Sequence, residues 1–139
     1  MSRILGLDVG TKYIGLAVSD TTLTLAQGKG KVLRRSDDVA IGRITEVIKE
    51  LGIEKIVVGL PVNMDGTMGE RAKDCRAFAE KLKEKTGLAV ELWDERLSTK
   101  EAEDVMLAAD MTRNKRKKVI DKLAAQLILQ GYLDSLENR

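Results

Sequence analysis

Acidic residues stand at three places in this chain where a solvent-exposed acid would be unusual. Asp8 interrupts the apolar run 4–9, Asp94 and Glu95 follow the apolar run 88–93, and Asp121 precedes an apolar row that includes Ala125. Carboxylates brought together from separate elements repel one another and are stable mainly with a hard cation between them. Their contexts therefore predict a site for Mg²⁺, which proteins hold with few carboxylates together with water and substrate phosphates.

The residue types that are missing narrow the chemistry further. The chain has no histidine, which excludes a Ser-His-Asp triad, a Cys-His pair and a His-ligated zinc ion. Cys75 is the single cysteine, so an intrachain disulfide is impossible, and its helical spacing with Ala72, Ala79 and Leu82 predicts a buried structural thiol. Mg²⁺ ions can activate a water molecule and stabilise the leaving oxygen of a phosphodiester, so hydrolysis of nucleic acid fits the remaining residue types.

Each acid also has a simpler interpretation. Asp8 could end its strand and support the following turn, and on spacing alone this interpretation weighs as much as a metal site. Asp94 and Glu95 could be solvated loop acids, and Asp121 could be a first-turn acid that interacts with a helix dipole. The combination of the three positions favours a shared site.

A basic run, TRNKRKK, covers residues 112–118 directly before Asp121 and contains no acid. Positive charge beside a carboxylate cluster would attract a polyanion and hold its phosphates near a metal. Such runs are more often solvated loops, but the position next to Asp121 favours nucleic-acid binding. The loop DGTMG before Glu70 could also offer backbone N–H groups to a phosphate, or it could be a plain turn.

Apolar periodicity and glycines predict the elements that must position these residues. Residues 4–20 are typical of a β-hairpin, in which Gly6 and Gly10 would leave room around Asp8 for a metal or phosphate. A third strand is expected over 23–35, a helix from Ser36 to Gly52, a strand over 55–60, a helix over 70–86, a strand over 88–94, a helix starting at Ser98, and a last helix over 119–136. This βββαβαβαα order predicts an α/β fold with one five-stranded mixed sheet flanked by helices.

Length and composition indicate the class of protein and the kinds of partner to expect. The 139 residues are expected to form a single domain, residues 1–139, with 43% hydrophobic and 33% charged residues and a net charge of +2. Aromatic residues make up 3%, which argues against a base-stacking platform. The chain shows no signal peptide and no run long enough to cross a membrane, so we expect no membrane partner and a cytoplasmic protein.

Four segments together resemble a known family. LGLDVGTKYIGLAVSD, VGLPVNMDGTMG, DERLST and KKVIDKLAAQLILQGYLD are similar to the blocks of the YqgF-like family of Holliday junction resolvases, also described as pre-16S rRNA processing nucleases. The blocks occur in the family's order and cover nearly the whole chain. The resemblance implies an RNase H-like fold, which agrees with the element order above.

The resemblance also implies roles for individual residues. Asp8, Glu95 and Asp121 would be the catalytic acids that bind a divalent metal, Mg²⁺ or Mn²⁺. Supporting positions would be Gly10, Thr11, Asp94, Ser98 and Thr99, and the expected nucleic-acid contacts are Lys12, Arg96, Arg113, Lys115, Arg116, Lys117 and Lys118.

Two departures qualify this carry-over. The family commonly has arginine where this chain has Tyr13, which removes one expected basic contact. The strand beside the first one ends in Gly59, Leu60 and Pro61, where the wider RNase H-like group often has an acid. Glu95 would then have to supply that carboxylate from the following strand.

These observations predict a metal-dependent endonuclease that acts on structured nucleic acid. They favour 5′-end processing of pre-16S rRNA, free or in ribosomal precursor particles, over cleavage of a DNA junction. Junction cleavage would usually require a symmetric dimer, and both monomer and homodimer stay open. Two alternatives come from other classes. Asp-x-Gly-Thr in a first hairpin resembles the phosphate loop of actin-like and sugar-kinase ATPases, which need two such domains. The other alternative is a non-catalytic RNA- or ribosome-binding protein.

Overall fold

The computed structural model describes residues 2–95 and 113–137, with side chains described for residues 2–95 and 123–136. Strands β1 (Arg3–Val9) and β2 (Tyr13–Ser19) form the predicted hairpin, in which Asp8 pairs with Gly15. The N–H of Gly10 donates to the carbonyl oxygen of Tyr13 at 2.9 Å, and a Cβ at Gly10 would lie 2.7 Å from that oxygen. Gly10 therefore serves the tight turn, and the prediction that it leaves room for a ligand is wrong.

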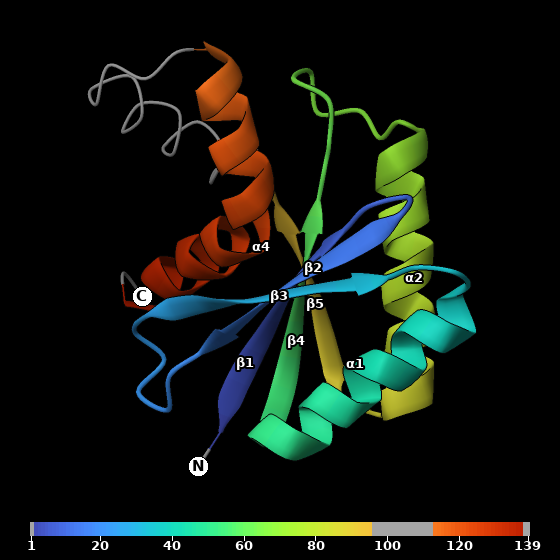
Figure 1. Ribbon diagram of the computed structural model, residues 1–139, viewed down its shortest axis with the longest axis vertical. Coiled ribbons are helices and arrows are strands. Elements are labelled where there is room, and N and C mark those ends of the chain that lie inside the picture. Colours follow the sequence, from blue (N-terminus) through green and yellow to red (C-terminus); the bar gives the residue numbers. More distant parts are fainter. Residues whose placement is uncertain (1, 96–112, 138–139) are drawn as a thin grey trace.

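Three further strands complete one sheet in the order β3-β2-β1-β4-β5. Strand β3 (Ala26–Leu33) extends the antiparallel meander, and β4 (Ile53–Leu60) and β5 (Ala89–Asp94) join β1 in parallel. This confirms the predicted five-stranded mixed sheet (Figure 1). The carboxyl ends of β1, β4 and β5 consequently lie at one edge of the sheet.

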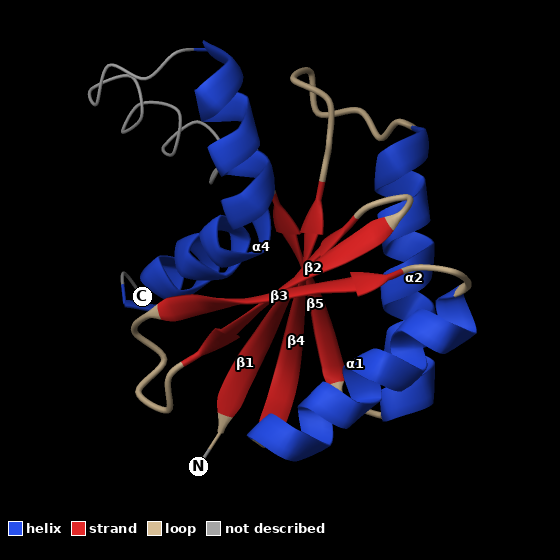
Figure 2. Cartoon of the chain, viewed as in Figure 1, coloured by secondary structure: helices blue, strands red, loops and turns tan. Residues whose placement is uncertain are grey.

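Two helices cover one face of the sheet (Figure 2). Helix α1 (Asp37–Leu51) begins after Ser36, whose hydroxyl accepts a hydrogen bond from the N–H of Val39, and ends at Gly52 in the left-handed conformation. Helix α2 (Glu70–Thr86) ends in the same way at Gly87. Both helices match their predictions because the cap residues and apolar spacing are local signals.

Helix α4 (Arg113–Glu137) covers the opposite face and begins earlier than expected. The basic run from Arg113 onward belongs to the helix, so the predicted start at Val119 is wrong. Lysine and arginine are good helix formers, and no proline breaks this segment. Asp121 therefore lies in the third turn, which removes the interpretation of Asp121 as a first-turn acid. The helix predicted to start at Ser98 lies outside the described residues.

Alternation along β1 divides the core into two parts. Leu5, Leu7 and Val9 pack toward α1 and α2, while Ile4 packs toward α4. A Cβ at Gly6 would lie 2.7 Å from the Cβ of Leu129, so Gly6 admits the helix, and its predicted role in ligand access is also wrong. Within the described residues, no helix combines the length and the apolar character needed to span a bilayer.

Candidate active site

The carboxyl ends of the parallel strands bring two predicted acids together. Asp8 is the penultimate residue of β1, and Glu95 directly follows β5. The backbone N–H of Glu95 donates to the carbonyl oxygen of Leu60 at 3.1 Å, which fixes the chain as it leaves the sheet. Parallel pairing thus positions two carboxylates at the sheet edge where open α/β folds carry their sites.

The glycine at position 59 lets Glu95 reach Asp8. A Cβ built on Gly59 would lie 2.7 Å from Oε1 and 3.0 Å from Cγ of Glu95. The side chain of Glu95 therefore passes over β4 where any larger residue would obstruct it. This geometry supports the hypothesis that Glu95 supplies the carboxylate that β4 itself lacks.

Burial and the neighbouring Asp8 make Glu95 a weaker acid than an exposed glutamate. Burial, followed by the negative charge of Asp8 and a hydrogen bond to it, raises the pKa of Glu95 from 4.5 to about 7. Asp94 adds to the rise and Arg71 opposes it. A protonated Glu95 donates to the Asp8 carboxylate, and a divalent cation could take the place of that proton. The chemistry of this donor pair fits an oxygen-ligated metal such as Mg²⁺.

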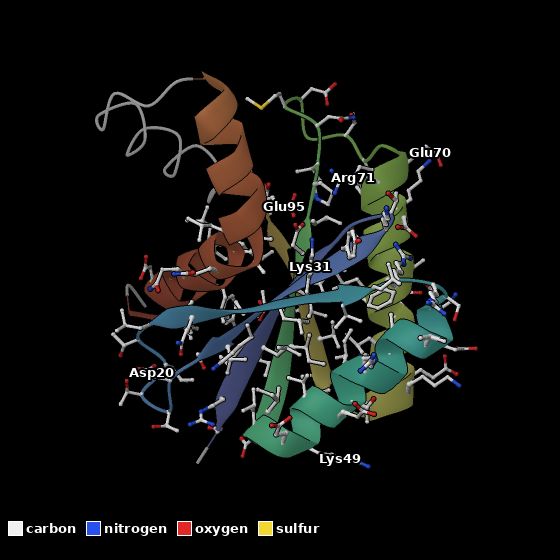
Figure 3. The ribbon with its side chains drawn as sticks, in the orientation of Figure 1. Asp20, Lys31, Lys49, Glu70, Arg71 and Glu95 are labelled. Carbon is white, nitrogen blue, oxygen red and sulfur yellow. The ribbon has the colours of Figure 1, made fainter. Side chains whose placement is uncertain are left out.

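Arg71 is a site residue that the sequence did not indicate. It lies in the first turn of α2, at the same end of the sheet as Glu95 (Figure 3), and its charge acts on Glu95. The preceding Gly69 makes no side-chain cap for this helix. A glycine-rich loop before a helix was the available signal, but it does not single out the arginine.

The remaining predicted residues have different outcomes. Asp94 ends β5 and is half-buried, and Thr11 and Lys12 are exposed in the hairpin turn. Arg96, Ser98 and Thr99 lie outside the described residues. The structure places Arg113, Lys115, Arg116, Lys117, Lys118 and Asp121 in α4, but their side chains are not described.

Helix α4 passes close to Asp8. Ala125 lies 3.5 Å from a Cβ built on Gly15, and that Cβ would lie 3.6 Å from the Cβ of Asp8. Position 121 precedes Ala125 by one helical turn on the same face. Among the described side chains, no group of three or more potential metal ligands occurs.

Cys75 lies behind the site, but its surroundings make it unreactive. It is buried, and its thiol donates to the carbonyl oxygen of Val9 at 3.4 Å. Burial, assisted by the charge of Glu95, raises the pKa of Cys75 to about 11. The predicted structural thiol is confirmed, since a neutral thiol is a poor nucleophile.

A family model described as "RuvX: Holliday junction resolvase" matches residues 2–135. The chain belongs to the RuvX family. A protein of Bacillus cytotoxicus, named "Putative pre-16S rRNA nuclease", is 52% identical over 135 residues, which cover 96% of this chain and 98% of the relative. A protein of the same name from Bacillus thuringiensis is 53% identical over the same shares of both chains. These matches confirm the family resemblance.

Solved structures confirm the fold. Thermus thermophilus RuvC in complex with a Holliday junction substrate aligns with a TM-score of 0.55 at 17% identity, over 94% of this chain and 92% of RuvC. A second Thermus thermophilus RuvC structure aligns with a TM-score of 0.56 at 15% identity, over 98% and 96% of the two chains. The RuvX family member therefore has the predicted RNase H-like fold.

Proposed function

We propose that this RuvX family member is a metal-dependent endonuclease that hydrolyses phosphodiester bonds in structured nucleic acid, with the 5′ region of pre-16S rRNA as its substrate. The observation that carries the proposal is the contact between the side chains of Asp8 and Glu95 at the carboxyl edge of the sheet, which Gly59 makes possible. The names of the relatives support the rRNA substrate. A Holliday junction is the second candidate, and the description of the family favours it.

Each proposed residue has a physical role. Asp8, Glu95 and Asp121 would hold Mg²⁺ or Mn²⁺, which when bound lowers the pKa of water and offsets the charge of the phosphate. Glu95 would release its proton to the solvent when the metal ion binds. Arg71 would place a guanidinium near the substrate phosphate, where a fixed cation stabilises developing negative charge.

Binding of the polyanion would use the basic residues on either side of the acids. Lys12 lies in the exposed hairpin turn, and the basic run from 113 to 118 forms the first turns of α4. Phosphate contacts of this kind give affinity that falls steeply with salt.

We further propose that residues 1–139 act as a single domain in the cytoplasm, on free pre-rRNA or on ribosomal precursor particles. Family membership favours a nuclease over a nucleotide-binding ATPase.

The test is cleavage of two labelled substrates, a pre-16S 5′ region and a four-way DNA junction, with Mg²⁺, Mn²⁺ or EDTA. Asp8→Asn, Glu95→Gln and Asp121→Asn should each lower the cleavage rate about 100-fold or more, since each removes a ligand charge. Asp38→Asn is the matched control, because Asp38 is an exposed acid of α1 and is not one of the proposed site residues.

Metal-dependent cutting of one substrate, lost in the three site variants and kept in Asp38→Asn, would establish the nuclease and identify its substrate class. An Asp8→Asn variant that cuts as well as the parent would contradict the enzyme proposal. Binding of either substrate with no cutting under any metal would favour the non-catalytic binding protein.

A further inference from the structure

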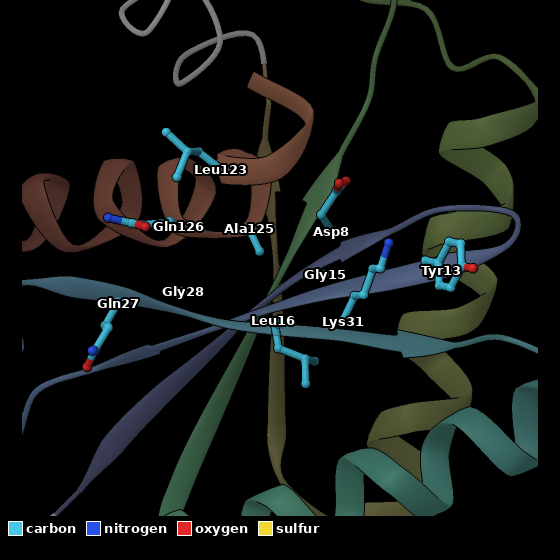
Figure 4. A pocket seen from close by; sticks show the side chains of 11 residues that line it. Asp8, Tyr13, Gly15, Leu16, Gln27, Gly28, Lys31, Leu123, Ala125 and Gln126 are labelled. Atoms are coloured by element: carbon cyan, nitrogen blue, oxygen red, sulfur yellow. The ribbon is translucent and has the colours of Figure 1, made fainter. Parts of the chain in front are cut away.

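We infer that a groove beside Asp8 binds one unpaired nucleotide of the substrate strand, with Tyr13 as the stacking surface for its base and Lys31 as a phosphate contact. This inference rests on the proposed nuclease function, because the groove opens from the same site. Figure 4 shows the groove between the β2–β3 ribbon and helix α4, with Asp8, Tyr13 and Lys31 around it.

The groove has the size of a ligand site. Its volume is about 870 Å³, and its lining runs from Asp8 on β1 across β2 and β3 to Gln126 on α4. Pockets that hold small ligands typically measure roughly 300–1,000 Å³. A ligand lying in this groove would therefore place its neighbouring phosphate near the proposed catalytic acids.

Glycines keep this space open. A Cβ on Gly28 would lie 3.4 Å from Oε1 of Gln126, and a Cβ on Gly15 would lie 3.5 Å from the Cβ of Ala125. Longer side chains at these positions would fill the gap between sheet and helix. The groove exists because the sheet presents bare backbone beneath α4.

An irregularity in β3 positions the lysine. The β2–β3 register shifts between Gly15 and Ala17, and Gly30 has a φ of 85°, so β3 carries an extra residue at this point. Lys31 then pairs with Gly15, which in turn pairs with Asp8. Directly paired residues share a face, and strands lie about 4.8 Å apart, so Lys31 and Asp8 stand about 10 Å apart on the same face of the sheet.

The mouth of the groove carries exposed apolar surface together with positive charge. Tyr13, which lines the groove, is 38% exposed. The Nζ of Lys31 lies 4.1 Å from the centre of the Tyr13 ring, and the Nζ of Lys12 lies 5.6 Å from it. An aromatic ring flanked by cations is the combination on which single-stranded nucleic acid stacks its bases and rests its backbone.

The occupant is an unpaired nucleotide for a chemical reason. Gln126 offers an amide to the edge of a bound base, and a base within a duplex already uses that edge for its pairing partner. The low aromatic content argues against a platform for many stacked bases, and one subsite needs a single ring. A purely structural role, in which Lys31 only covers the Tyr13 ring, makes a different prediction about ligand fluorescence.

The test uses RNA with a duplex stem and a single-stranded 5′ extension that carries 2-aminopurine at one position at a time. EDTA prevents cutting, so binding is measured alone. The parent should quench 2-aminopurine at one position, Tyr13→Phe should keep the quenching, and Tyr13→Ala should lose it and bind about tenfold more weakly. Because Tyr13 is exposed, its variants should keep the unfolding midpoint of the parent.

Lysine variants supply the matched comparison. Lys31→Ala should lower the slope of log affinity against log salt by about 0.7, the value for one phosphate contact on a single strand. Lys29→Ala removes the same charge from the same strand, but Lys29 lines a separate cavity near Asp20, so its salt slope should match the parent. Equal losses in the two lysine variants would overturn the inference, as would quenching that persists in Tyr13→Ala.

Cleavage with Mg²⁺, measured in parallel, separates the two proposals. A parent that quenches the probe at one position but cuts neither substrate would keep the subsite and contradict the nuclease. A parent that cuts, alongside a Tyr13→Ala variant that binds and cuts equally well, would keep the nuclease and overturn the subsite.

Discussion

Glu95 shows how a single residue can be arranged for ligand binding at a cost to stability. Its carboxyl is buried against Asp8, and the charge of Arg71 offsets only part of the resulting rise in its pKa. The pKa of about 7 means that the proton leaves near neutral pH, after which two negative charges face each other in a partly buried site. A bound cation would relieve that repulsion, so the free protein should be less stable than the loaded one.

The stability of the metal-free protein should therefore depend on pH through Glu95. The pKa is raised from 4.5 in the unfolded chain to about 7 in the fold. The contribution of protonated Glu95 to the free energy of unfolding is present below pH 4.5 and is lost as the pH rises through 7. Glu95→Gln should abolish this loss of stability. At pH 8 the free energy of unfolding of the variant should exceed that of the parent by on the order of 2 kcal/mol.

Urea unfolding in EDTA at pH 5.5 and pH 8 measures this difference. Glu84→Gln, an exposed change on α2, serves as the control and should follow the parent at both values. If the stability of Glu95→Gln depended on pH in the same way as that of the parent, the pKa of the Glu95 carboxyl would not be raised in the fold.

At the scale of elements, Arg34 connects three segments below the site. Its guanidinium donates to the carbonyl oxygen of Gly10 in the hairpin, to Asp37 at the start of α1, and to Asp74 on α2 through two bonds of 2.7 and 2.9 Å. It also lies 5.1 Å from the centre of the Phe78 ring. The side chain is 9% exposed, so its bonds are poorly replaced by water.

Arg34→Met should destabilise the fold by about 2–3 kcal/mol, because it removes the paired bonds to Asp74 and leaves Asp37 with Lys81 alone. Arg34→Lys should recover only part of this loss, since an ammonium cannot make the paired bonds. Arg35→Met, an exposed neighbour, should change the free energy of unfolding by less than about 0.5 kcal/mol.

Acid should reduce the Arg34→Met effect. The bonds from Arg34, opposed by burial, hold the pKa of Asp74 below its usual value of 3.8. A lowered carboxyl pKa contributes stability above 3.8 that is lost as pH falls through the folded value. Parent and Arg34→Met should therefore converge in urea titrations below that pH, and a gap that stays constant would contradict the ion-pair argument.

At the scale of the molecule, the two faces of the sheet are covered by different helices. Helices α1 and α2 close the larger core, while α4 lies on the other face of the sheet (Figure 1). The contact of α4 with β1 depends on Gly6, above which Leu129 lies too close for any other side chain. Packing within the core therefore sets the distance between α4 and the sheet, and with it the distance between α4 and Asp8.

Gly6→Ala tests this coupling. Its new methyl would meet the Cβ of Leu129 at 2.7 Å, and overpacking of this kind should destabilise the fold by about 1–3 kcal/mol. Cleavage should fall further than the loss of folded protein explains, because α4 would shift relative to Asp8. Gly42→Ala in α1, where a Cβ meets no atom within 4 Å, should instead stabilise by about 0.5–1 kcal/mol and leave cleavage unchanged.

The sequence by itself determined the elements, because their signals are local. Ser36, Gly52 and Gly87 mark helix ends through caps that involve only near neighbours. The start of α4 was missed because a basic run carries helix propensity but no apolar period, and the period was the signal used.

Only the tertiary structure decided which residues meet. Gly6 and Gly10 looked like space for a ligand, whereas one admits a helix and the other forms a turn. Arg71 and Lys31 join the site through helix placement and an irregular strand register, which no spacing in the chain encodes. The same holds for Glu95, whose raised pKa arises from burial and from Asp8 across the sheet. Desolvation and charge depend on every nearby atom, so they are fixed only once distant segments have packed together.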